Sequence, residues 1–298
     1  MNKLKKIGLS ALAGSLVATS AFAGEMSVGG SAKATWTDRE SSTVTGNNFG
    51  MNKLLSFNGS GDLDNGNSIS VYFGNNGTSQ SSAYMTYDMG DLGSLTLDNG
   101  AGGHGIGSID DKTPTAAEEI WDNISYGTGH DGFRVGVGNA GAIAYKTTLG
   151  GMTISADYVK QGGGSLEDGA TGAAGSGTGK SVALTMSPAD GLSVGIGAGE
   201  AGTATSSRDS DQVTAFATFA VGAFSVGGQL AEESTDNNND WNTQQWGVSF
   251  NVSDSISIGY GERTVDVGNA NSSTEEESSG ISASWTAGSI SVSGNLNK

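Results

Sequence analysis

Few residues in this sequence have the type and spacing that catalysis or metal binding needs. The chain has two histidines, His104 and His130, and no cysteine. The histidines stand far apart, each in a glycine-rich segment. A zinc site needs several His or Cys ligands, and a Ser-His-Asp relay needs a histidine beside a serine and an acid. The sequence therefore argues against a metal centre, a thiol nucleophile and a hydrolase triad, and we do not expect an enzyme.

Two further strings match binding motifs only in part. Residues Gly136 to Gly141 have the glycine spacing of a dinucleotide fingerprint, but residues 142–147 have a strand pattern where that motif needs a helix. We interpret them as a glycine-rich turn. Residues Asp236 to Asp240 begin like a calcium loop, yet Trp241 stands where the loop needs glycine. Weak Ca²⁺ binding by acidic loops, or by the run Glu275 to Glu277, is the alternative to plain solvated charge. No other cofactor is expected.

The composition is strongly acidic and rich in glycine. Lys and Arg number 14, Asp and Glu 31, and Gly 50 against 2 Pro. The first 23 residues hold three of the lysines and none of the acids, so the rest of the chain has a net charge of −20. A surface of this charge repels phosphates, which argues against a nucleic-acid partner. Low proline suits β-strands, because proline removes a donor from the ladder.

The N-terminus has the pattern of a secretory signal peptide. Lys3, Lys5 and Lys6 precede an apolar stretch from Ile7 to Val17, and Ala21-Phe22-Ala23 supplies small residues beside a cleavage point. A transmembrane helix is the alternative, but the stretch is shorter than the ~20 residues that cross a bilayer. We therefore predict export, with residues 1–23 removed and the mature chain beginning at Gly24.

Apolar residues recur at every second position in most of the remaining chain. This period of two predicts β-strands with one apolar and one polar face. Clear segments are Met26–Trp36, Ile69–Phe73, Met152–Tyr158, Val182–Met186, Leu192–Ile196, Val213–Phe219, Phe224–Leu230, Trp246–Val252, Ile256–Tyr260 and Ile281–Trp285.

The connections between these segments alternate in length. Short turns are expected at residues 187–191, 221–223, 253–255 and 287–288. Long polar loops are expected at residues 38–50, 98–122, 161–180, 200–210, 232–243 and 265–279. Short turns at one end and long loops at the other are typical of outer-membrane β-barrels, in which the turns lie in the periplasm and the loops outside the cell.

We therefore predict an all-β fold, a transmembrane antiparallel barrel of about sixteen to eighteen strands. In hydrocarbon an open sheet edge would leave unpaired backbone groups, so the sheet must close. The apolar face then meets lipid and the polar face a wet interior. Aromatic residues near strand ends suit an interfacial girdle, namely Trp36, Trp246, Trp285, Tyr158 and Tyr260. The last segment, residues 289–293, runs outward, so an even barrel needs one more strand; either the count is off by one or the sequence is truncated.

The chain resembles the Gram-negative general porins, especially the alphaproteobacterial group. The resemblance is sharpest over Tyr84 to Asp98, which is similar to the turn and fifth strand of those porins, and the Lys-Lys-Ile-Gly-Leu start also fits. Asn295-Leu296-Asn297-Lys298 departs from the terminal aromatic residue of the family. The resemblance implies a channel for passive diffusion of small hydrophilic solutes and ions, a homotrimer, and surroundings of outer-membrane lipid and lipopolysaccharide.

The resemblance also implies that residues 98–122 form the loop that narrows the pore. Charged side chains opposed across a narrow gap bias the passage of ions. The acidic side would be the carboxylates of this loop, namely Asp110, Asp111, Glu118, Glu119 and Asp122. The basic side would be residues on the inner wall, namely Lys33, Arg134, Lys146 and Arg263. Because acids outnumber bases, we predict a mild preference for cations.

Two other classes of protein stay open at this point. A secreted acidic surface β-protein, such as an adhesin, explains the composition and the export, but it does not explain alternating loop lengths. An outer-membrane enzyme would need a serine, a histidine and an acid meeting on the barrel.

Overall fold

The computed structural model describes residues 24–38, 48–77, 79–120, 140–160, 178–202, 209–236, 240–269 and 272–298. These ranges contain fifteen β-strands and two short 3₁₀ helices, against the sixteen to eighteen strands expected of the whole chain. Within the same ranges there is no helix of the length and apolarity that crossing a membrane requires. Strand order follows chain order from β1 to β15, and the strand pairs are antiparallel. The predicted all-β, antiparallel character is confirmed.

The chain divides into two compact units, Met1–Ala101 and Gly102–Lys298. The first is a meander in which each strand pairs with the next. Its elements are β1 (Met26–Trp36), β2 (Phe49–Asp62), β3 (Ser68–Asn76), β4 (Ser79–Asp88), the 3₁₀ helix η1 (Gly90–Leu92) and β5 (Ser94–Asn99).

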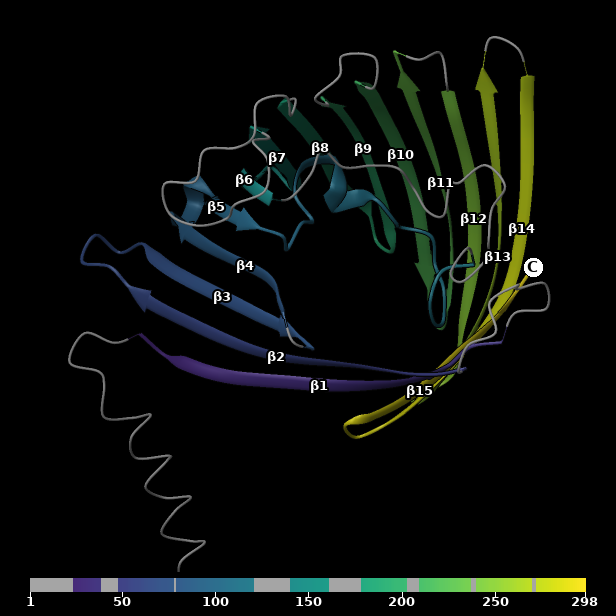
Figure 1. Cartoon of the computed structure of the whole chain (residues 1–298), viewed down its shortest axis with the longest axis horizontal. Helices are drawn as coiled ribbons and strands as arrows, with labels where there is room; N and C mark the ends of the chain where they lie inside the picture. Colours follow the sequence, from purple (N-terminus) through teal and green to yellow (C-terminus); the bar gives the residue numbers. More distant parts are fainter. Residues whose placement is uncertain are drawn as a thin grey trace, which may run out of the picture. The chain divides into compact units, whose positions relative to one another are not determined.

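The second unit is a curved sheet with the 3₁₀ helix η2 on its concave side (Figure 1). We call the concave side the inner face and the opposite side the outer face. The elements are η2 (Gly105–Ile109), β6 (Ala140–Leu149), β7 (Met152–Lys160), β8 (Thr178–Ala189), β9 (Leu192–Ala201), β10 (Ser210–Val221), β11 (Phe224–Thr235), β12 (Asp240–Ser253), β13 (Ile256–Asn269), β14 (Ser272–Ala287) and β15 (Ile290–Asn297).

Tight turns join β6 to β7, β8 to β9, β10 to β11, β12 to β13 and β14 to β15, as the alternation of connection lengths predicted. Gly191, in the turn between β8 and β9, has φ +74°. A Cβ atom there would also lie 2.1 Å from the carbonyl oxygen of Ala220. Only glycine meets both conditions, because other residues rarely adopt this φ and none could fit a side chain.

One predicted loop is wrong. The polar residues 265–279 belong mostly to strands, because β13 runs to Asn269 and β14 begins at Ser272. Glu275, Glu276 and Glu277 pair in register with Asp266, Val265 and Thr264. The predicted loop 232–243 is likewise shortened by β11 and β12 at either end. Alternation of apolar residues marks only the part of a strand that has an apolar face, so the sequence pattern does not distinguish a polar strand end from a loop.

Burial in the second unit is the reverse of that in a soluble protein. Gln229 and Arg263, on the inner face, are each 1% exposed, whereas Phe250 is 44% and Ile258 47% exposed on the outer face. Soluble monomers rarely expose a continuous apolar surface of this kind. The apolar residues at alternate positions of the strands therefore lie on the outer face, as predicted. Val226 is 36% exposed, so it is not part of a dry core.

The outer face carries the aromatic residues that the sequence placed there. Trp246, Tyr158, Tyr260 and Trp285 are all exposed. The Trp246 and Tyr260 rings meet edge to face at 5.6 Å, and the Trp246 indole donates to Glu262 Oε2 at 3.2 Å.

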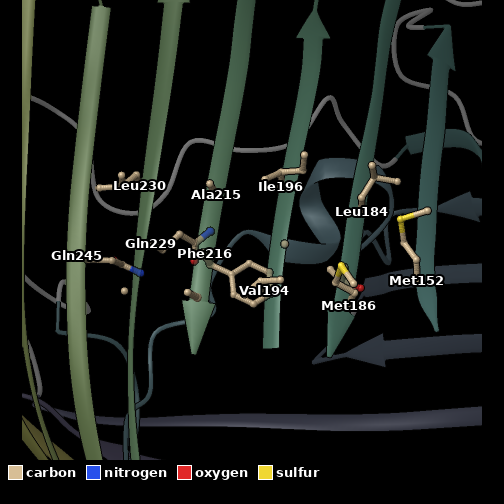
Figure 2. Close-up of a pocket in the computed structure, with 14 residues that line it drawn as sticks. Met152, Leu184, Met186, Val194, Ile196, Ala215, Phe216, Gln229, Leu230 and Gln245 are labelled. Atoms are coloured by element: carbon tan, nitrogen blue, oxygen red, sulfur yellow. The ribbon is translucent and has the colours of Figure 1, made fainter. Parts of the chain in front are cut away.

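Between the larger side chains of the outer face lies a groove of about 660 Å³ on β7 to β12. Figure 2 shows its residues, with Leu184 on β8, Ile196 on β9 and Leu230 on β11. Ala215, Ala217 and Gly228 also line it, and small residues of this kind leave room between larger neighbours. The groove therefore belongs to the apolar surface of the sheet.

Candidate functional site

Residues 102–120, here named the inner loop, cross the inner face of the second unit from β7 to β15. Residues Gly105 to Glu119 contact nearly every strand on the way. Eight strand spacings of ~4.8 Å make a path of roughly 38 Å. Fourteen residue steps reach at most about 50 Å when extended. Beyond the short helix η2, the inner loop therefore follows an open path and forms a strap that the wall holds at intervals along its length.

The first anchor of the strap is at β7 and β8. The Gly105 backbone N–H donates to Ser155 Oγ at 3.0 Å, and that of Ile106 donates to Ser181 Oγ at 2.8 Å. Ser181 in turn donates to Asp157 Oδ1. The first backbone donors of a helical turn lack partners within the turn, so the two serines satisfy them.

An apolar contact follows this anchor. Ile106 and Ile109 are 0% and 1% exposed, and Ile109 clusters with Ala183 and Phe216. A Cβ atom on Gly197 would lie 2.9 Å from Ile106 and 3.1 Å from Ile109. Burying each isoleucine contributes roughly 1.5–3 kcal/mol. The absence of a side chain at Gly197 lets both sit against the wall.

Gln229 on β11 is the central polar anchor. Its amide nitrogen donates to the carbonyl oxygens of Ile109 at 2.6 Å and Asp110 at 3.2 Å, and its oxygen accepts from the Lys112 N–H at 2.8 Å. The same nitrogen lies 3.0 Å from Thr214 Oγ1, which itself donates to the Leu230 carbonyl. One buried side chain thus satisfies three backbone groups of the inner loop.

Gln245 on β12 repeats the arrangement one strand further on. It is the register partner of Gln229. Its amide nitrogen donates to Asp111 Oδ1 at 3.2 Å and to Thr113 Oγ1. The Thr113 N–H donates to the same Asp111 oxygen at 3.2 Å. Two adjacent glutamines therefore position the acidic part of the inner loop.

The end of the inner loop is held by β14 and β15. The Ala116 N–H donates to Ser282 Oγ at 3.1 Å. The side-chain amides of Asn295 and Asn297 donate to the Glu119 carbonyl at 3.2 and 3.3 Å. Both asparagines lie on β15, so the last strand takes part in holding the loop.

Glycines form the wall where the middle of the inner loop lies against it. A Cβ atom on Gly247 would lie 2.5 Å from the Pro114 carbonyl oxygen, and one on Gly259 would lie 2.9 Å from the Ala116 nitrogen. A Cβ atom on Gly261 would meet Ile120 at 3.1 Å. Since these neighbours include backbone atoms, the loop can lie this close only because the wall has no side chains there.

Three of the predicted acids come together. Burial, and then Glu119, which shares a side-chain hydrogen bond with it, raises the pKa of Asp111 from 3.8 to about 7. Burial also raises the pKa of Asp110, while Lys112 acts in the opposite direction. Glu118 is exposed, and its backbone carbonyl accepts from Thr115. Asp122 lies outside the described residues.

The predicted basic residues are placed separately. Lys146, on β6, is the register partner of Ser155 and lines a cavity beside the inner loop. Arg263, on β13, is 1% exposed between its register partners Gln245 and Ser278. Lys33 is exposed on β1, in the first unit. Arg134 lies outside the described residues.

The polar groups near His104 do not have the order of a hydrolase triad. Electrostatic interaction links His104 to Asp157, but the Ser181 hydroxyl donates to that carboxylate and accepts from the Ile106 N–H. A serine nucleophile needs the histidine as its base. No group of three His, Cys, Asp or Glu residues within the described ranges could hold a metal ion. His130 and most of the strings at 136–141 and 236–240 lie outside these ranges.

The residues that anchor the inner loop were not among the predicted site residues. Gln229, Gln245 and Ser282 lie on the polar parity of their strands. Two large amides at that parity, near glycines, are the signal that could have drawn attention to them. Their partners are 117 to 167 positions away in the chain, so no local pattern identifies the contacts.

Comparison with known proteins adds a family and a fold. A family model described as Gram-negative porin matches residues 8–297. No curated protein matches the sequence.

Solved porins have the same fold at low sequence identity. A porin refined at 1.8 Å is 15% identical, with a TM-score of 0.67 over 92% of this chain and 94% of that one. Salmonella typhi OmpF in complex with daunomycin is 12% identical, with a TM-score of 0.66 over 92% and 90%. A mutant of Rh. blastica porin is 14% identical, with a TM-score of 0.59 over 92% and 94%. The predicted fold class, a porin β-barrel, is confirmed.

Proposed function

The chain belongs to the Gram-negative porin family, and we propose that it is an outer-membrane channel for small hydrophilic solutes and ions that mildly prefers cations. Two features of the second unit together carry the proposal: polar residues are buried while apolar residues are exposed, and the inner loop crosses the polar face. The outer face is apolar, and a strap bearing carboxylates crosses the polar inner face. A lipid-facing exterior and a polar interior are what a wide membrane barrel requires.

The cation preference rests on the charge of the inner loop. Asp110, Asp111 and Glu119 interact electrostatically with one another on the inner loop. Fixed negative charge in a water-filled constriction raises the local concentration of cations. In this proposal residues 98–122 narrow the pore, and Lys33, Arg134, Lys146 and Arg263 supply the opposing positive charge.

The proposal has three further parts, and family membership supports two of them, the outer-membrane setting and the trimer. Residues 1–23 direct export as a signal peptide and are then removed. The mature protein is embedded among outer-membrane lipid and lipopolysaccharide and assembles as a homotrimer. Residues 1–23 lie outside the described ranges, so the signal peptide rests on its sequence pattern alone.

Planar-bilayer recording tests the channel and its selectivity together. In a KCl gradient we expect open-channel currents and a reversal potential that favours K⁺. At pH 9, where Asp111 is ionised, the triple variant D110N/D111N/E119Q should lower the K⁺/Cl⁻ permeability ratio roughly threefold, because the negative charge of the inner loop is removed. The control E275Q/E276Q/E277Q removes three acids from β14 and should change the ratio little. Anion preference in the unaltered protein would contradict the proposal.

Selectivity should also depend on pH near neutrality. The pKa of Asp111 is raised from 3.8 to about 7, so the folded protein holds a proton that the unfolded chain has released. The extra proton adds to the free energy of unfolding. This contribution is fully present below pH 4 and is lost as the pH rises through 7. The inner loop gains a negative charge over the same range, so the K⁺/Cl⁻ ratio should rise.

Reversal potentials between pH 5 and pH 9 measure this titration. D111N should remove the step near pH 7, whereas D254N, at the turn between β12 and β13, should retain it. A step of equal size in D111N would show that another group is responsible.

A further inference from the structure

A polar cavity of about 320 Å³ lies between the inner loop and the short-turn end of the second unit. Its wall residues include Thr153, Ser193 and Thr218, which lie within a few positions of the strand ends next to the turns. Ser108 and Lys112 of the inner loop also line it. The cavity is therefore on the opposite side of the inner loop from the long loops.

Two lysines line this cavity. Lys112 comes from the inner loop and Lys146 from β6. Neither lysine takes part in an ion pair within the part of the chain that the structure describes. By contrast, Lys180 on β8 contacts Glu200 at 3.0 Å. Lys146 is thus available to an incoming charge, and among the described residues Lys112 has only the electrostatic interaction with Asp110 to compete with one.

The rest of the lining suits an anion. Residues with hydroxyl groups come from five neighbouring elements, namely Ser108, Thr153, Ser155, Thr185, Ser193 and Thr218. The Ser108 hydroxyl donates to the Gly105 carbonyl oxygen, so the other five are the candidate donors to an anion. None of the described residues that line the cavity carries a carboxylate. Asp110, which interacts with Lys112, is two residues away on the inner loop but does not line the cavity. In a chain with 31 acids against 14 bases, this local excess of positive charge is unusual.

The volume sets the size of the ligand. At about 30 Å³ for each water molecule, the cavity holds roughly ten waters. A phosphate-sized oxoanion fits there with part of its hydration shell. Oxoanions accept hydrogen bonds from hydroxyl and ammonium groups, and charge-assisted bonds are the stronger kind.

We propose that this cavity is a binding subsite for small oxoanions such as inorganic phosphate, formed by Lys112, Lys146 and the surrounding hydroxyl groups. The proposal rests on the proposed function, because the ligand reaches the cavity through the channel. The acids of the inner loop disfavour anions, and the lysine pair beyond them offsets that repulsion locally. Solutes that carry a phosphate group would then pause at the subsite while they cross.

Phosphate block of the KCl current measures the subsite. Phosphate added to one side of the bilayer should reduce the current. Chloride added to give the same concentration of negative charge should not reduce it. A lysine–anion contact near 4 Å in a watery site contributes about 1 kcal/mol, which is about a fivefold change in affinity. K112Q and K146Q should each raise the half-blocking concentration about fivefold, and the double variant about twenty-fivefold. K180Q, which removes a lysine that does not line the cavity, should leave it unchanged.

Phosphorus NMR gives a second readout that needs no conduction. The folded protein in detergent should broaden the ³¹P resonance of inorganic phosphate, and K112Q/K146Q should abolish the broadening. Current without phosphate block or broadening would overturn the subsite while the channel stands. Absence of current with broadening retained would overturn the channel and support the subsite. If chloride blocked the current as well as phosphate does, or if K180Q weakened the block as much as K112Q, the block would come from the overall charge of the protein. Either result would also overturn the subsite.

Discussion

Replacing Gln229 and Gln245 together by leucine should free the inner loop from the wall. The two amides make hydrogen bonds to Ile109, Asp110, Lys112, Asp111 and Thr113. A buried polar group left without its partner costs about 1–3 kcal/mol. Leucine has a similar volume but no donor or acceptor, so at least three backbone groups of the inner loop lose their partners. We expect the docked loop to be destabilised by several kcal/mol.

Hydrogen exchange of residues 105–113 measures the release directly. A loss of about 3 kcal/mol should speed exchange of the protected amides by roughly a hundredfold or more, since 1.4 kcal/mol is a factor of ten. Single-channel recording should show a larger or fluctuating conductance, because the strap no longer has a fixed position.

The matched control is Q244L. Gln244 is the neighbour of Gln245 on β12, but its side chain is exposed on the outer face. Q244L should leave exchange of the inner loop and the conductance unchanged. If Q229L/Q245L left them unchanged as well, the apolar contact of Ile106 and Ile109 would be the main anchor instead.

The sequence was enough to predict the sheet because the information is local. Alternation of apolar residues identified the outer face of strands such as β11 and β12, and the short turns fell where the structure has them. It was not enough for the ends of β13 and β14. There the strands extend beyond their apolar part, and only pairing with each other shows that polar residues such as Glu275 remain in the sheet.

Of the candidate site, the sequence predicts only the charged residues. The acids of the inner loop were visible as a run, and Asp110, Asp111 and Glu119 do interact. The register of the loop against the wall was not visible, because Gln229 meets Lys112 across 117 positions. Nor could the role of Gly247 be read from the sequence. A glycine in a strand looks like a weak strand residue until the segment that lies against it is known.

Adding methyl groups at Gly247 and Gly259 should push the middle of the inner loop away from the wall. The new Cβ atom at Gly247 would lie 2.5 Å from the Pro114 oxygen, and that at Gly259 would lie 2.9 Å from the Ala116 nitrogen. Both neighbours are backbone atoms, so a change of rotamer cannot relieve the contact. Overpacking of this kind costs about 1–3 kcal/mol at each site. Because the sheet is braced by its ladders, the strap is expected to move.

G247A/G259A should therefore change single-channel conductance while the barrel stays folded, which is checked by its heat-modifiable migration on SDS gels. The control is G268A, on the same strand as Gly259, where a Cβ atom would meet nothing within 4 Å. Alanine also disfavours unfolded conformations relative to glycine, so G268A should retain or slightly raise stability. If G247A/G259A had the same conductance as the unaltered protein, the inner loop could be displaced by several tenths of an ångström without changing the bore of the channel. The glycines would then matter for assembly of the sheet and not for the bore of the channel.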